Sequence, residues 1–167
     1  AGVVGVLVAM LAMGEGFQAT LKGTGSDEAA IILRGGSQVE TDSVISRKQA
    51  PLVVGVAGIA RSADGRPLAS PEVSQVVNLP SKADGTDANV QMRGVGDEGW
   101  EVRPHMRLVQ GRRFERGLRE IVVGQGVSAQ YRGVEVGKTL RLGNEDWTVV
   151  GVFASGDSHD SEMWTDA

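Results

Sequence analysis

The chain has 167 residues, of which 41% are apolar and 23% are charged, a composition typical of a folded domain with an apolar core. Its net charge of −4 argues against a nucleic-acid binder, which would normally carry a basic surplus on one face. Because the chain contains no cysteine, disulfides, thiolate nucleophiles and cysteine-based metal sites are excluded.

The first thirteen residues, AGVVGVLVAMLAM, contain no polar side chain. As a helix they would rise about 20 Å, whereas the hydrocarbon core of a bilayer is about 30 Å thick. Two interpretations stay open, a buried core helix and the outer end of a transmembrane helix. The polar, glycine-broken stretch that follows favours the membrane interpretation, because it is typical of a helix leaving the bilayer.

The segment up to residue 72 predicts two strands, one helix and a loop. Apolar runs predict strands over 29–37 and 52–61. Between them, 37–50 predicts a helix, with Ser37 and Glu40 spaced as a capping box and Pro51 at its end. Residues 62–72, which contain Asp64-Gly65 and two prolines, predict a loop.

The rest of the chain predicts short strands with a few small helices. Residues 97–106 indicate a short helix or an irregular connection, and 125–133 indicate a helix of about two turns. Gly143-Asn144 is typical of a two-residue hairpin turn. Strands are expected over 73–79, 88–95, 107–114, 118–124, 138–143, 145–153 and 162–165. This order of elements predicts an α+β fold.

The stretch IVVGQGVSAQYRG, residues 121–133, has the G-x-G-x-x-A spacing that opens a dinucleotide-binding turn. A genuine site needs a βαβ unit with a helix long enough to cross the sheet. Gly133 and Gly137 break the chain within two turns, and a hairpin follows. We therefore interpret Gly124 as turning the strand and Gly126 as letting the short helix pack closely.

Two further motifs fail on spacing. Gly137-Lys138-Thr139 lacks the first glycine of a phosphate-binding loop, since Arg132 stands at that position, and it enters a strand. Ser128 fails the nucleophile-elbow pattern, because Gln130 stands where the second glycine belongs. No constellation of residues therefore supports catalysis.

Three polar segments each allow an ordinary structural interpretation as well as a functional one. The cluster GDSHDSE offers oxygen and imidazole ligands for a cation, but a solvated turn is the commoner explanation. The arginines of 112–119 are interleaved with acids, which is typical of a solvated face. The loops 62–72 and 80–88 are flexible connections or contact surfaces for a partner. The residues concerned are Asp157, His159, Asp160 and Glu162 in the cluster, and Arg112, Arg113, Arg116 and Arg119 on the face.

These pieces, taken in order, resemble the periplasmic core domain of MacB/FtsX-type ABC transporter permeases. The resemblance covers nearly the whole chain, and its most specific part is a long spaced pattern. The pattern runs Gly111-Arg112-x-Phe114, Glu120-Ile121-Val122-Val123-Gly124, Gly133, Gly137 and the strand 147–153.

The resemblance implies a domain organisation. Residues 1–13 would be the C-terminal end of a transmembrane helix, and 14–61 would begin a mixed α/β subdomain. Residues 62–160 would form a β-rich subdomain of short strands inserted into it, and 161–167 a return strand. The domain would lie on the periplasmic side of the inner membrane, followed in the complete permease by three more membrane helices.

The resemblance also implies a mechanical function and not an enzymatic one. The domain would transmit ATP-driven motion to cargo or a periplasmic partner, in efflux, export or lipoprotein release. Implied partners are a cytoplasmic ATPase, a second permease subunit, and a periplasmic adaptor or cargo protein. No catalytic, cofactor-binding or metal-binding residue carries over, because the ATPase does the family's chemistry.

Two other classes of function stay as alternatives. The first is a free-standing soluble binding module, in which residues 1–13 form a buried N-terminal helix. The second is a small dinucleotide-dependent enzyme, which the short helix at 125–132 disfavours.

Overall fold

The computed structural model describes residues 29–167, of which residues 33–167 form one unit. The predicted end of a membrane helix, residues 1–13, lies outside the described residues. Within residues 29–167, no helix combines the length and the apolar character that a membrane crossing needs.

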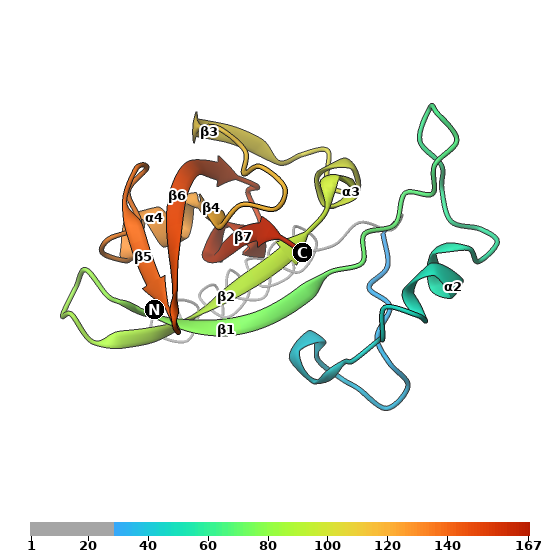
Figure 1. The fold of residues 1–167 in the computed structure, drawn as a ribbon, viewed down its shortest axis with the longest axis horizontal. Coiled ribbons are helices and arrows are strands. Elements are labelled where there is room, and N and C mark those ends of the chain that lie inside the picture. The colour runs from blue at the N-terminus through green and yellow to red at the C-terminus, as the bar shows by residue number, and fades with distance from the viewer. Residues whose placement is uncertain (1–28) are drawn as a thin grey trace, which may run out of the picture. The chain divides into compact units, whose positions relative to one another are not determined.

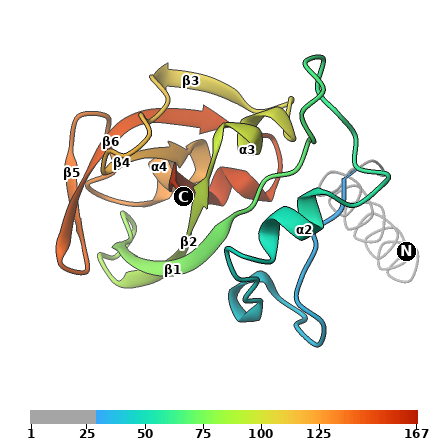
Figure 2. The ribbon, with the colours of Figure 1, turned by 45° about the vertical axis from the view of Figure 1, so that its right-hand side comes forward.

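A seven-stranded mixed sheet organises residues 33–167 (Figure 1). Strands β2 and β7 run parallel, as do β4 and β6, and the other pairs are antiparallel. β1 and β3 lie at opposite ends of the sheet (Figure 2). Its main path runs β1 (Val73–Pro80), β2 (Asp87–Val95), β7 (Glu162–Asp166), β4 (Glu120–Gly124), β6 (Glu145–Ala154) and β3 (Arg107–Gly111), and β5 (Thr139–Leu142) also pairs with β6.

The sheet is buried on both faces around β4. Ile121 and Val123 point into one apolar cluster and Val122 into the other, because successive side chains of a strand face opposite sides. Helix α4 (Gln125–Gln130) contributes Val127 to the first cluster, and helix α3 (Asp97–Glu101) contributes Trp100 to the second. The continuous apolar run of β4 is what a strand buried on both faces requires.

The second cluster is built around three aromatic rings. The Trp164 ring centroid lies 5.1 Å from that of Trp100 and 5.3 Å from that of Phe153. Tilted and edge-on contacts of this kind add to the free energy gained by burial. Trp164 and Phe153 are both fully buried, so this cluster fixes α3 against the sheet.

The strands predicted from residue 73 onward are confirmed, with boundaries that differ by a few residues. The hairpin between β5 and β6 turns at Gly143, whose φ is +59°. Residues 97–106 contain a short helix, α3, and the predicted helix over 125–133 is the shorter α4. Together with the mixed sheet, these elements confirm the predicted α+β class.

The strands predicted over 29–37 and 52–61 are wrong. Residues 29–37 form no strand, and residues 50–54 form helix α2 (Ala50–Val54) with Pro51 in its first turn. A proline fits there because the first helical residues need no N–H donor. The apolar side chains of these segments are not buried among the described residues: Ile31 is 71% exposed and Leu52 is 73% exposed. The strand predictions rested on the expectation that these apolar runs are buried, and in the part of the chain that the structure describes they are not.

The predicted helix over 37–50 is also wrong, and only a 3-10 turn, η1 (Glu40–Asp42), forms there. The capping box is not made, because the Glu40 carboxylate binds Arg93 instead, at 2.6 Å from Nη1. The Ser37 hydroxyl donates to the Asp42 carbonyl. A long-range ion pair has thus replaced the local capping interaction.

Candidate functional site

The dinucleotide interpretation of residues 121–133 fails in the structure. Strand β4 does lead into a helix at Gly124, but α4 has only six residues. The following strand, β5, pairs with β6 and not with β4. The backbone of residues 159–160 packs against both glycines: a Cβ at Gly126 would lie 2.8 Å from the Asp160 carbonyl oxygen, and one at Gly124 would overlap it. The space in front of these glycines is filled by the protein itself.

Replacing Gly124 by alanine is expected to destabilise the fold by about 1–3 kcal/mol, because the new methyl group would overlap the backbone of residues 159–160. Chemical denaturation of the chain measures this loss. Gly35→Ala is the matched control, because Gly35 has no positive φ and no atom lies within 4 Å of the added Cβ. Equal effects at both positions would contradict the packing role of Gly124.

The two other motifs are ordinary structure. Gly137 is a turn residue with φ of +89°, and Thr139 begins strand β5, so no helix follows Lys138. Ser128 lies in α4, where its carbonyl accepts from Lys82 Nζ at 2.7 Å. Both histidines of the chain hydrogen-bond Asp157 and not Ser128. Neither motif has the local structure that its function would require, since Lys138 leads into a strand and Ser128 lies within a short helix.

The interpretation of residues 156–162 as a solvated turn is right for the turn but wrong for the side chains of Asp157 and Glu162, which are only 9% and 8% exposed. The segment forms a 3-10 turn, η2 (Ser158–Ser161), and strand β7 begins at Glu162. Asp160 accepts from the backbone N–H groups of Ser155 and Gly156, at 2.7 and 3.1 Å. These carboxylates are bound by amides, arginines and histidines. Among the described residues no group of three or more ligands could hold a metal ion.

The most connected polar feature of the structure is a group of ion pairs around two arginines, which we call the arginine cluster. Its members are Glu40, Glu72, Arg93, Arg103, His105, Asp157, His159 and Glu162. They come from η1, the loop before β1, β2, the connection from α3 to β3, η2 and β7. The cluster therefore joins the segment that precedes the sheet to strands at its centre.

Arg93 is the centre of the cluster. It is 4% exposed, on β2, and its Nε and Nη2 donate to both oxygens of Glu162 at 2.8 Å each. Its Nη1 donates to Glu40 at 2.6 Å and to Glu72 at 2.9 Å. Glu162 also accepts from Trp164 Nε1 at 2.8 Å. A planar guanidinium is suited to this, because its five donors can serve several carboxylates at once.

Arg103 extends the cluster towards the histidines. Its Nη1 and Nη2 donate to the two oxygens of Glu72, at 2.6 and 3.0 Å, and its Nε donates to His159 Nε2 at 3.1 Å. Its guanidinium carbon lies 5.1 Å from the centroid of the Trp164 ring. His159 in turn lies beside Asp157, which also contacts His105.

Two carboxylates of the cluster, those of Glu72 and Asp157, have pKa values below their ordinary ones. Burial opposes ionisation of Glu72, but the hydrogen bond and charge of Arg103 and the charge of Arg93 lower its pKa below the ordinary value. Burial likewise opposes ionisation of Asp157, and hydrogen bonds from Ser155 and His159 lower its pKa. A carboxyl with a depressed folded-state pKa stabilises the fold above about pH 4, and this contribution is lost as the pH falls through the folded value.

Sequence reasoning missed the arginine cluster. The alternation of β2 did predict a half-buried strand, but an arginine at a buried position was not singled out. Glu72 ends the loop 62–72, which was expected to be a flexible connection or a contact surface. The one available signal was the set of acids near residue 160, which need cations if they are buried.

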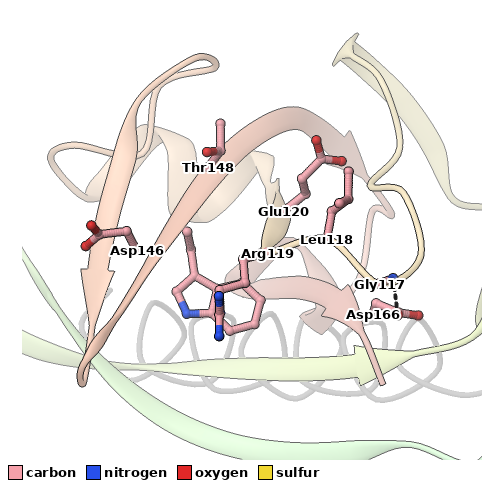
Figure 3. A pocket seen from close by; sticks show the side chains of 8 residues that line it. Gly117, Leu118, Arg119, Glu120, Asp146, Thr148 and Asp166 are labelled. Carbon is pink, nitrogen blue, oxygen red and sulfur yellow. Dashed lines mark hydrogen bonds between the residues drawn. The ribbon is translucent and has the colours of Figure 1, made fainter.

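A shallow hollow lies elsewhere on the sheet, beside the turn that precedes β4 (Figure 3). Its volume is about 600 Å³, and Arg119, Asp146 and Thr148 are among the residues that line it. Arg119 pairs with Glu145 at 3.0 Å, and Gly117 donates its N–H to Asp166 at 2.7 Å. Several polar groups at its rim, those of Arg119, Gly117 and Asp166 among them, are thus already engaged by other groups of the protein.

The predicted solvated arginine face is confirmed for Arg116 and Arg119. The Arg116 and Arg119 side chains are 67% and 60% exposed. Arg112 differs, because it binds both oxygens of the buried Glu120, and the pKa of Glu120 is lowered chiefly by that hydrogen bond. Arg113 stacks its guanidinium over the Trp100 ring, 4.4 Å from the centroid.

Comparison with known proteins gives one family and two similar folds. Residues 2–167 match the family model described as the MacB-like periplasmic core domain. The periplasmic region of MacB from Actinobacillus actinomycetemcomitans has a TM-score of 0.54 and 15% identity, over 80% of this chain and 62% of that one. The extracellular domain of the noncanonic ABC-type transporter YknZ from Gram-positive bacteria has a TM-score of 0.50 and 19% identity, over 73% of this chain and 62% of that one.

At these identities the two structures share the fold with this chain. The aligned region spans 62% of the length of each of them. No curated protein matches the sequence.

Proposed function

The chain belongs to the family of MacB-like periplasmic core domains, and from this premise we propose that it is the extracytoplasmic part of an ABC transporter permease. In this role it transmits ATP-driven motion of membrane helices to cargo or to a periplasmic partner, in efflux, export or lipoprotein release. The similar structures support this placement, because they are described as periplasmic or extracellular regions. The chain itself carries out no catalytic step in this proposal.

The arginine cluster is the observation that carries the mechanical role. Transmission of motion needs a stiff connection between the segment that receives the movement and the body that delivers it. Arg93 supplies one, since it binds Glu40 and Glu72 before the sheet and Glu162 at its centre. Movement of residues 40–72 is thereby passed directly to β2 and β7, and not dissipated in a flexible loop.

The remaining parts of the proposal concern organisation and partners. Residues 1–13 end a transmembrane helix, 14–61 begin a mixed subdomain, 62–160 form the inserted β-rich subdomain, and 161–167 are its return strand. The location of β1 to β6 within 62–160 supports the β-rich part. The partners are a cytoplasmic ATPase, a second permease subunit, and a periplasmic adaptor or cargo protein. The domain lies on the outer side of the cytoplasmic membrane.

A single introduced cysteine tests location and motion together, because the chain contains none. Ala63 is exposed in a turn closed by the hydrogen bond from Gly65 N–H to the Ser62 carbonyl. In the complete permease, Ala63→Cys is expected to react with a membrane-impermeant maleimide in intact cells. In the purified permease with its ATPase, the distance between dyes on the two copies is expected to change when ATP is added.

The permease without the introduced cysteine is the control for labelling, and ATP with the ATPase inactivated is the control for motion. Labelling only after cell lysis would contradict the extracytoplasmic location. Labelling in intact cells without an ATP-dependent distance change would contradict the mechanical role and leave the location standing.

A further inference from the structure

His159 lies between a hydrogen-bond acceptor and a hydrogen-bond donor of the arginine cluster. On one side, its Nδ1 is 2.8 Å from Asp157 Oδ1. On the other, Arg103 Nε donates to its Nε2 at 3.1 Å. The ring meets the Trp164 ring edge to face, with 5.9 Å between centroids, and the side chain is only 17% exposed.

These two contacts fix where the imidazole carries its hydrogen. Arginine has only donors, so the Arg103 contact requires an unprotonated Nε2 as acceptor. A carboxylate has only acceptors, so the Asp157 contact requires a hydrogen on Nδ1. In this arrangement His159 is therefore a neutral ring with its hydrogen on Nδ1.

We propose that His159 is a proton-operated release for Arg103, in which a proton bound at Nε2 breaks the contact between the two side chains. Binding that proton removes the acceptor that Arg103 Nε uses. It also places an imidazolium about 3 Å from a guanidinium, where like charges repel. No other lone pair of the ring can receive the proton, because Nδ1 already carries hydrogen.

The groups around His159 determine which contact gives way. Asp157, on the same turn, attracts the imidazolium, so the histidine stays with it. Asp160 is occupied by the Ser155 and Gly156 backbone amides. His105, from the connection to β3, faces the other oxygen of Asp157 at 3.0 Å. Among the described residues, Arg103 is thus the cation that opposes the proton, and it moves away from His159.

Release of Arg103 reaches beyond the histidine. Arg103 binds Glu72 with two hydrogen bonds and lies over the Trp164 ring. Glu72, in the segment before β1, is held by two arginines, Arg93 and Arg103. Displacing Arg103 leaves it held by only one of the two, Arg93. Acidification therefore loosens this junction. The inference goes beyond the proposed function and does not depend on it.

Nitrogen NMR of the histidine rings in the full chain tests the proposal, because the chain has only two histidines. At about pH 7.5 the His159 ring is expected to carry its hydrogen on Nδ1. As the pH is lowered stepwise from there, it is expected to gain the Nε2 hydrogen. The Trp164 indole N–H resonance is expected to shift in the same step.

Two variants separate the histidines. In His159→Gln the side-chain amide oxygen can accept from Arg103 at every pH, so the Trp164 step is expected to disappear. In His105→Gln, which removes the exposed histidine of the cluster, the step is expected to remain. A step that persists in His159→Gln, or that disappears in His105→Gln, would overturn the proposal.

The NMR measurements on the unmodified chain test the proposal even if a variant fails to fold. A His159 ring with its hydrogen on Nε2 at about pH 7.5 would remove the premise. A ring that gains the second hydrogen with no change at Trp164 would show that Arg103 is not released. None of these measurements involves transport, so they stand or fall separately from the permease assignment.

Discussion

Replacing Arg93 by methionine is expected to lower the free energy of unfolding by about 3–5 kcal/mol. The reason is not the loss of an attraction but the charges that are left behind. The Glu162 and Glu72 side chains are only 8% and 12% exposed, and Arg93 binds both. Without it, Glu162 keeps only the N–H of Trp164 among its side-chain partners in the described part of the chain. Urea denaturation followed by circular dichroism measures the loss.

Two comparisons identify the cause of that loss. Arg141→Met removes an arginine whose ion pair with Asp146 is about 60% exposed on both sides, and is expected to cost less than about 1 kcal/mol. Adding Glu162→Gln to Arg93→Met removes the stranded charge and is expected to recover part of the stability. An Arg93→Met loss below about 1 kcal/mol, or no recovery in the double variant, would contradict a role for buried charge.

Replacing Trp164 by alanine is expected to lower the free energy of unfolding by about 3–5 kcal/mol as well, for a different reason. The ring is fully buried between Trp100 and Phe153, so its removal leaves a cavity that the backbone of a central strand cannot collapse to fill. The change also deprives Glu162 of the indole N–H. The same urea denaturation measures this effect.

Trp164→Phe is the matched control, because it keeps an aromatic ring in the cluster and removes the N–H group. Its loss is expected to be smaller than that of Trp164→Ala, since most of the volume remains. If the two variants lost equal stability, the hydrogen bond to Glu162 would outweigh the packing of the ring.

The strands of the sheet could be predicted because the local order of apolar and polar residues matches which of their faces are buried. Ile121 to Val123 form an unbroken apolar run, as a strand covered on both faces requires. Val90 and Met92 alternate with polar neighbours, as a half-covered strand requires. The segment 29–61 could not be predicted in this way, because apolar residues such as Leu52 stay exposed among the described residues, and periodicity then carries no information on burial.

The arginine cluster could not be predicted because it depends on the register of strands far apart in sequence. Arg93 reaches Glu162, 69 residues later, only because β2 and β7 lie side by side with Arg93 opposite Trp164. Nothing in the local sequence of either strand indicates this neighbour. The acidic segment 156–162 looks solvated in sequence for the same reason, since its partners are distant or local groups that no pattern reveals: Arg93 binds Glu162, the histidines bind Asp157 and backbone amides bind Asp160.

The position of β7 constrains the order in which the fold can be completed during synthesis. Of the described strands it is made last, yet it lies between β2 and β4 and pairs with both. Until residues 162–166 leave the ribosome, β1 and β2 on one side and β3 to β6 on the other are separate pieces, each with an unpaired strand edge facing the gap. Unpaired strand edges of this kind favour wrong pairing between nascent chains until β7 fills the gap.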